Sequence, residues 1–301
     1  MQVGFIGTGN IGTPMALQLI NKGFNLYVND INFSAAEFLI NKGAIWANSP
    51  KDLTEKVDII CVCLPGPIEA KEVVFGENGI MNSIKSGTIY IDHTTNSIEV
   101  IRDISTQLNI KGVEVLDAPV SGGVEGAKTR DLTFLVGGDL DTLNNARPVL
   151  DAMGKTVLHV GPVGSGNICK LMHNCANFSL SLATIQCLSV AVKAGLDPSV
   201  VIEVFQKSAL GRNFDLQVRL PETLFKGDFE PRFSLKLANK DLNLAIDLAK
   251  SLGVNFSMAE TCQIDMLEAI QKGWDNMDSS IFLTLQEEKA GVLLRHNKNQ
   301  K

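Results

Sequence analysis

The sequence has few aromatic residues and no surplus of basic residues, and each shortage excludes a class of protein. Aromatic residues make up 6% of the 301 residues, which argues against the base-stacking surfaces of single-strand nucleic-acid binders. The formal net charge is −6, whereas proteins that bind nucleic acid or anionic lipid carry a basic footprint. We therefore expect neither nucleic acid nor a membrane as a partner.

The cysteines and histidines lack the spacings of a metal site. None of the six cysteines forms a CxxC pair, and none of the four histidines stands four residues from another. The N-terminal residues do not have the basic and apolar segments of a secretory leader, so reduced thiols are expected. The sequence thus predicts a cytoplasmic protein without a bound metal.

One uncharged run, Leu171–Val192, is as long as a transmembrane helix. Eight of its 22 residues are polar, and so many polar groups would be costly in lipid. We expect a long helix of a soluble protein, apolar or small nearly all round and surrounded by protein.

The first half of the sequence alternates short apolar runs with helical patterns such as Ile11–Lys22 and Ser34–Asn41. This alternation predicts an α/β fold with right-handed crossovers and a largely parallel, Rossmann-like sheet. The predicted strands are Gln2–Ile6, Leu26–Asn29, Val57–Leu64, Thr88–Asp92, Val113–Asp117, Thr133–Val136 and Thr156–Val160.

The pattern changes after a glycine-rich stretch at 161–166, beyond which helical periodicity dominates. We expect an NAD-binding domain over residues 1–162 and an all-α substrate and oligomerisation domain over 163–301, with a long interdomain helix. Asp197 and Pro198 start one predicted helix, and Ala238–Leu252 and Met258–Ile270 form two more. Because one small helical core must also cover the apolar 171–192 helix, we expect a homodimer or homotetramer.

A GxGxxG motif, formed by Gly7, Gly9 and Gly12 with Asn10 and Ile11 between them, follows the first predicted strand and opens a helix. This context is typical of dinucleotide binding, because the glycines allow a tight turn and close approach of the pyrophosphate to the helix N-terminus.

The second predicted strand is followed directly by Asp30, which stands 18 residues after Gly12. A carboxylate there accepts hydrogen bonds from ribose hydroxyls and repels a 2′-phosphate. The next residue is Ile31 rather than an arginine, so the sequence predicts NAD rather than NADP.

Two further segments carry polar groups suited to a substrate. Ser121, Gly122 and Gly123 follow the strand ending at Asp117, and their backbone N–H groups and hydroxyl suit a carboxylate, although such a turn is often just flexible. Lys170 falls in the early turns of the long helix with Asn174 one turn later, an arrangement that suits either proton transfer or a solvated surface charge. His173 is a rival acid/base or a core histidine.

The sequence resembles the β-hydroxyacid dehydrogenase family over about residues 2 to 290. The resemblance rests on four motifs in the family's order, at 7–12, 117–123, 161–174 and 240–245. It implies a reversible oxidation of a small carboxylate-bearing β-hydroxy acid to a semialdehyde or keto acid with NAD, in a homo-oligomeric enzyme.

The same resemblance assigns roles residue by residue. Lys170 matches the family's catalytic lysine, whose pKa we expect to fall toward neutrality because an ordinary lysine, at about 10.4, is a poor base there. Asn174 matches its supporting amide, and Ser121, Gly122 and Gly123 match the substrate-carboxylate loop. Cofactor contacts are implied for Leu64, Pro65, Thr95 and Lys240.

Some features leave alternatives open. Glu69 and His93 depart from the residues common in relatives, and Arg212 suits either a second substrate carboxylate or a helix cap. Two alternatives to this function remain. They are a non-catalytic dinucleotide-binding protein of the same fold and an imine or sugar-acid reductase. The presence of both Lys170 and Asn174 argues against a non-catalytic protein, and an imine reductase would be expected to replace Lys170. The sequence does not specify which hydroxy acid is the substrate.

Overall fold

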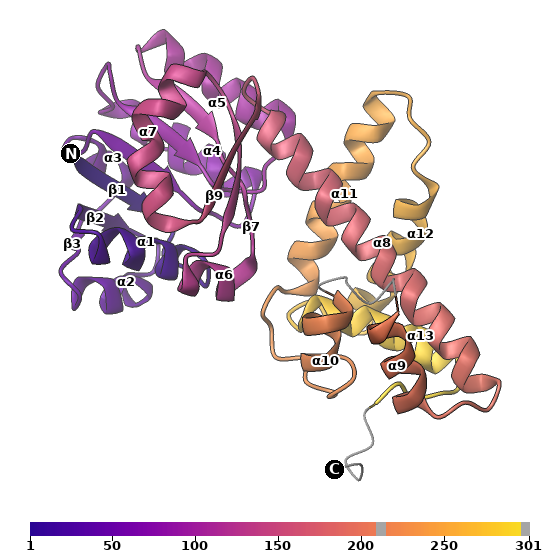
Figure 1. The fold of residues 1–301 in the computed structure, drawn as a ribbon. Coiled ribbons are helices and arrows are strands. Elements are labelled where there is room, and N and C mark those ends of the chain that lie inside the picture. Colours follow the sequence, from indigo (N-terminus) through magenta and orange to yellow (C-terminus); the bar gives the residue numbers. More distant parts are fainter. Residues whose placement is uncertain (209–214, 296–301) are drawn as a thin grey trace. The chain divides into compact units, whose positions relative to one another are not determined.

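The computed structural model describes residues 1–208 and 215–295, which form two compact units (Figure 1). The first unit spans Met1–Leu171 and contains the sheet, and the second, Met172–Lys301, is mainly helical. The division falls inside one long helix, α8 (Ser165–Lys193). Each unit is described by itself below.

The first unit is built on a nine-stranded sheet in the order β3-β2-β1-β4-β5-β6-β8-β7, with β9 paired to β8. All seven predicted strands occur, and the two-residue strands β3 and β7 were not predicted. The strands are β1 (Gln2–Ile6), β2 (Asn25–Asn29), β3 (Ile45–Trp46), β4 (Ile59–Val62), β5 (Ile89–Asp92), β6 (Glu114–Asp117), β7 (Val120–Ser121), β8 (Thr133–Gly137) and β9 (Thr156–Gly161).

Strand β1 lies at the point where the order of the sheet reverses, since it pairs in parallel with β2 on one side and β4 on the other. The loops that leave β1 and β4 therefore diverge and form the crevice in which ligands of such sheets bind. The sheet is parallel from β3 to β6, as predicted, whereas β8 runs antiparallel to β6 and β7.

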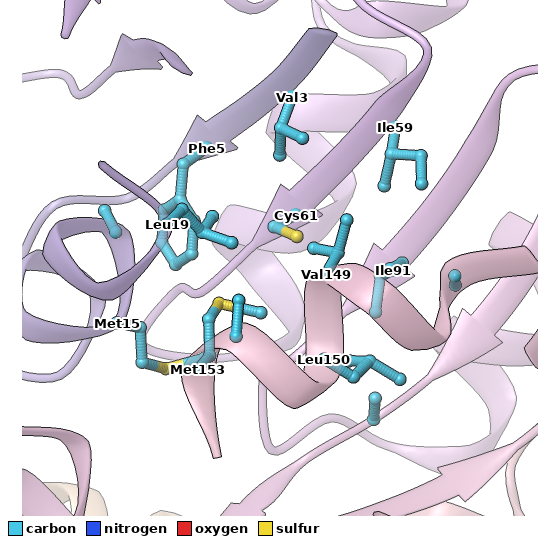
Figure 2. Packing of buried hydrophobic residues seen from close by; sticks show 14 of the residues in the cluster. Val3, Phe5, Met15, Leu19, Ile59, Cys61, Ile91, Val149, Leu150 and Met153 are labelled. Carbon is cyan, nitrogen blue, oxygen red and sulfur yellow. The ribbon is translucent and has the colours of Figure 1, made fainter. Parts of the chain in front are cut away.

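Helices bury apolar side chains on both faces of this sheet. On one face, Met15 and Leu19 of α1 (Gly12–Asn21) and Met153 of α7 (Leu140–Met153) pack toward Phe5 and Cys61 (Figure 2). The other face is covered by α3 (Pro50–Thr54), α4 (Pro67–Phe75) and α5 (Ile98–Ile110). The unit also contains α2 (Phe33–Ile40), η1 (Ile80–Asn82) and α6 (Gly123–Thr129).

The second unit contains the predicted helices. Asp197 caps α9 (Pro198–Lys207) by accepting the Ser199 N–H at 2.8 Å, as the Asp-Pro pair predicts. The predicted helices at 238–252 and 258–270 are α11 (Leu235–Ser251) and α12 (Ser257–Gln271). The shorter elements are η3 (Asp215–Arg219), α10 (Leu220–Glu222), η4 (Ser279–Leu283) and α13 (Thr284–Ala290).

Helix α8 contains the uncharged run singled out in the sequence. By length and composition alone it could cross a membrane, a test that the core helix of a globular protein also passes. In its most apolar 18-residue window, 44% is buried within the chain.

Candidate active site

The glycine motif forms the turn between β1 and α1. A Cβ atom on Gly12 would lie 1.9 Å from the carbonyl oxygen of Gly7, so only glycine lets helix and strand approach this closely. A Cβ on Gly9, in contrast, would meet no atom of the described residues within 4 Å, and both Gly9 and Asn10 are exposed. Contacts among the described residues therefore do not require a glycine at position 9. This is expected where a ligand approaches the backbone.

Within residues 1–208 and 215–295, no side chain caps the N-terminus of α1. Ile11 occupies the capping position and makes no side-chain cap hydrogen bond. Backbone N–H groups at a helix start need acceptors, and the helix dipole favours an anion there. The exposed loop and uncapped helix fit the pyrophosphate of a dinucleotide.

Asp30 lies at the carboxyl end of β2, beside the glycine loop. Its Oδ2 accepts the Thr8 N–H at 2.7 Å, and its Oδ1 accepts the Asn32 N–H at 2.9 Å. These bonds hold the half-buried carboxylate at the edge of the crevice and leave further lone pairs for ribose hydroxyls.

The loops after β4 and β5 are joined to each other. The Leu64 N–H donates to Thr94 Oγ1 at 3.1 Å, and the Thr94 N–H donates to Asp92 Oδ1 at 2.9 Å. Leu64 and Thr95 are half-buried and Pro65 is exposed. Three of the residues predicted to contact the cofactor therefore stand together at the carboxyl edge of neighbouring strands.

The predicted carboxylate loop follows β7. Gly122 has a φ of 129° and Gly123 a φ of 61°, a backbone conformation that favours glycine, and both residues are exposed. Ser121 is half-buried and pairs with Thr133 of β8. The turn presents a hydroxyl and consecutive backbone N–H groups, which suit an anionic group.

Lys170 is half-buried in the second turn of α8, and the first unit holds the helix just before it. The Asp117 carboxylate, fully buried at the end of β6, accepts the N–H groups of Gly164 and Asn167 at 2.8 Å each. Burial raises the pKa of Asp117 to about 6, and these donors partly oppose that rise. The lysine thus follows a helix start fixed to the strand that leads into the Ser121–Gly123 turn.

Within the second unit, Asn174 is held by a buried carboxylate. Its Nδ2 donates to Asp241 Oδ2 at 2.7 Å, and Lys240 Nζ lies 2.6 Å from Asp241 Oδ1. Asn174 comes one helical turn after Lys170 on α8. Asp241 is 2% exposed and was not singled out from the sequence, although it adjoins Lys240 in the same motif.

The histidines differ from their sequence-based interpretations. His173 is exposed, with its Nδ1 3.2 Å from Asn174 Oδ1, so the interpretation as a core histidine is wrong. His93 is buried, and its Nδ1 lies 2.8 Å from the Ala118 carbonyl oxygen. Burial lowers the pKa of His93 to about 4, which keeps the imidazole neutral. Arg212 lies outside the described residues.

The fold and the glycine loop define the first unit as a Rossmann-type dinucleotide-binding unit, and comparison with known proteins identifies the family. A family model described as the NAD binding domain of 6-phosphogluconate dehydrogenase matches residues 2–161. A second, described as NAD-binding of NADP-dependent 3-hydroxyisobutyrate dehydrogenase, matches residues 164–285.

Several relatives match this sequence along most of its length. The sequence is 34% identical over 284 residues to the probable mitochondrial 3-hydroxyisobutyrate dehydrogenase of Dictyostelium discoideum, covering 93% of this chain and 88% of that protein. It is 34% identical over 287 residues to the 2-hydroxy-3-oxopropionate reductase of Escherichia coli, covering 95% and 97%.

Solved structures of 3-hydroxyisobutyrate dehydrogenases share the fold of this chain. The 3-hydroxyisobutyrate dehydrogenase of Salmonella typhimurium aligns with a TM-score of 0.86 at 26% identity, covering 95% of this chain and 99% of that one. The Mycobacterium tuberculosis 3-hydroxyisobutyrate dehydrogenase, solved with L-serine, aligns with a TM-score of 0.84 at 28% identity and the same coverage.

The chain belongs to the β-hydroxyacid dehydrogenase family. It is an oxidoreductase that uses a nicotinamide dinucleotide and acts on CH–OH groups.

Proposed function

We propose that this enzyme interconverts a small β-hydroxy acid and its semialdehyde or keto acid, with NAD as the preferred cofactor and Lys170 as the general acid/base. The observation that carries this proposal is the placement of Lys170 directly after a helix start that is bonded to the end of β6, the strand leading into the Ser121–Gly123 turn.

Each group has a role in the proposed reaction. Ser121 and the N–H groups of Gly122 and Gly123 bind the substrate carboxylate and so fix the carbinol carbon, and such positioning supplies much of an enzyme's rate. Lys170 Nζ takes the hydroxyl proton during oxidation and returns it to the carbonyl oxygen during reduction. Asn174 keeps the amine and the hydroxyl aligned. A nicotinamide dinucleotide held by the first unit would supply the hydride-transfer chemistry of this reaction.

The cofactor is held by Gly7, Gly9, Asn10, Ile11 and Gly12 at the pyrophosphate. Asp30 binds the adenosine ribose, and its negative charge favours NAD over a cofactor with a 2′-phosphate. Further contacts come from Leu64, Pro65, Thr95 and Lys240.

The remaining parts of the proposal concern organisation. Residues 1–162 form the cofactor domain and 163–301 the substrate and oligomerisation domain of a homo-oligomer. A cytoplasmic location is supported by the six cysteines, all of which are free thiols.

Replacing Lys170 tests the chemical step. Lys170→Ala should lower kcat by about 10²–10⁴, because it removes the proton-transfer group. NAD affinity, measured by fluorescence titration, should stay near that of the wild type, because the glycine loop is untouched. Retention of more than about a third of the wild-type kcat would refute the role of Lys170.

His173→Ala is the matched control, since this exposed side chain lies on the same stretch of α8. It should cost far less activity than Lys170→Ala, and the reverse result would exchange the two roles. Assays with 3-hydroxyisobutyrate, 2-hydroxy-3-oxopropionate and L-serine, compared by kcat/KM, identify the substrate class.

A further inference from the structure

Four polar side chains in the first unit form a buried cluster where β5, β6 and α8 meet. Asp92, Asn96, Asp117 and Asn167 are each 0% exposed, and we name them the clamp. Buried polar groups persist only where hydrogen bonds replace water, so their partners show what the cluster holds together.

Both the oxygen and the nitrogen of the Asn167 side-chain amide make hydrogen bonds. Its Oδ1 accepts the Asn96 N–H at 2.7 Å, and its Nδ2 donates to Asp117 Oδ2 at 3.2 Å. Asn96 in turn donates through Nδ2 to Asp92 Oδ2 at 3.1 Å. The clamp therefore links the ends of β5 and β6 to one side chain in the first turn of α8.

The carboxylate of Asp117 also caps the helix from another strand. It accepts the N–H groups of Gly164 and Asn167, two of the donors that a helix start leaves without intrahelical partners. A Cβ on Gly166 would lie 2.3 Å from the Leu135 carbonyl oxygen, so the first turn rests directly on the backbone of β8. The start of α8 cannot slide along the sheet without breaking these contacts.

The clamp also fixes the direction in which the first two turns of α8, within the first unit, present their side chains. Asn167 and Lys170 are spaced i and i+3, and this spacing places them on one face of a helix. Because the Asn167 amide is held between two fixed partners, the direction of that face is set one turn before the lysine.

We propose that Asn167 is a positioning residue, which through its bonds to Asn96 and Asp117 aims the face of α8 that carries Lys170. The inference rests on the proposed role of Lys170. Displacing a catalytic group by about 1 Å can cost about 10² in rate, so loosening the clamp should reduce kcat more than cofactor binding.

Exchanging the clamp partners tests the inference. Asn167→Asp opposes two carboxylates, and Asp117→Asn opposes two amide donors, so each should lower kcat by about 10-fold or more. Kd for NAD should change less than about threefold in both variants, since the glycine loop is intact.

A matched control separates positioning from general destabilisation. Thr54→Val removes the buried hydrogen bond of Thr54 to the Lys51 carbonyl oxygen, 2.9 Å long, in α3. It should lower Tm without lowering kcat per NAD-binding site. If Asn167→Asp does not fold, Asn167→Ser replaces it in the experiment. Its kcat should be lower than that of Thr54→Val when the two variants have the same Tm.

Three results decide the matter. An unchanged kcat in Asn167→Asp or Asn167→Ser overturns the inference. A loss of kcat in Thr54→Val equal to that in Asn167→Ser at equal Tm overturns it as well. Full activity of Lys170→Ala would instead remove the proposed function on which the inference rests.

Discussion

We expect Asp30 to determine which dinucleotide binds, because a carboxylate at the end of the second strand repels a 2′-phosphate. We expect the wild type to bind NAD at least about tenfold more tightly than NADP, a difference of about 1.4 kcal/mol. In the wild type the Thr8 N–H donates to Asp30 at 2.7 Å. Asp30→Asn keeps an acceptor for this bond but removes the negative charge, so the ratio of the NAD and NADP affinities should become smaller. Fluorescence titration with both cofactors measures it, and equal affinities in the wild type would contradict the assignment.

His93 should make the enzyme sensitive to acid. Its pKa is about 4 in the folded chain against 6.5 in a solvated histidine, so between these values only the unfolded chain binds the proton. The free energy of unfolding must therefore fall as the pH drops from about 6.5 to 4, by about 3 kcal/mol at full extent. The contribution is fully present above pH 6.5.

Urea unfolding at pH 7.5 and pH 4.5 checks this expectation. His93→Asn keeps a donor toward the Ala118 carbonyl oxygen but has no titrating group, so its loss of stability in acid should be smaller. Asp117 contributes in the opposite direction, because its raised pKa favours the folded state in acid. This contribution of Asp117 is the same in the wild type and in His93→Asn, so it cancels when their losses of stability in acid are compared. Equal acid sensitivity of the two proteins would disprove the role of His93.

At the scale of elements, the sequence predicts the strands well where hydrophobic runs are long. The two-residue strands β3 and β7 were missed because two residues carry no periodicity. The predicted strand Val57–Leu64 was too long, since β4 ends at Val62 and Leu64 instead bonds Thr94 in the loop. Apolar composition continued into that loop and hid the end of the strand.

The error at His173 has a physical reason in helix geometry. Successive residues on a helix point about 100° apart, so the apolar neighbours Leu171 and Met172 say little about the side on which His173 lies. Spacing of three or four residues is informative, and the prediction that Lys170 and Asn174 share a helix is confirmed by α8. The clamp was not predicted, because its four members come from three separate segments that only the fold brings together.

The junction between β1 and α1 gives a prediction at this scale. Gly12→Ala would place a methyl group 1.9 Å from the Gly7 carbonyl oxygen, so the helix must move away from the strand. NAD affinity should fall by about 10-fold or more, while the far-UV circular dichroism of the whole protein stays close to that of the wild type. Gly23→Ala is a control for backbone strain alone, because Gly23 has a φ of 83° and a Cβ there would meet no described atom within 4 Å. This control should leave NAD affinity unchanged. Unaltered affinity in Gly12→Ala would contradict the tight-junction interpretation.

At the scale of the whole molecule, apolar side chains remain uncovered on the second unit. Val190 of α8, Val204 of α9 and Ile264 of α12 are 69%, 58% and 65% exposed. Another subunit would bury such groups, and closed symmetric assemblies are the usual solution. We expect a homodimer or homotetramer, which light scattering at micromolar concentration detects. A single species near 32.5 kDa would disprove it.

The central position of β1 has a practical consequence for attaching the enzyme to other objects. In a parallel sheet all amino ends share one edge, and the cofactor loops leave from the opposite edge. Met1 is exposed and stands directly before Gln2, where β1 begins. Any chain or group that precedes β1 would thus lie at the edge opposite the dinucleotide crevice, whereas removing residues 2–6 would take away a strand held by neighbours on both sides.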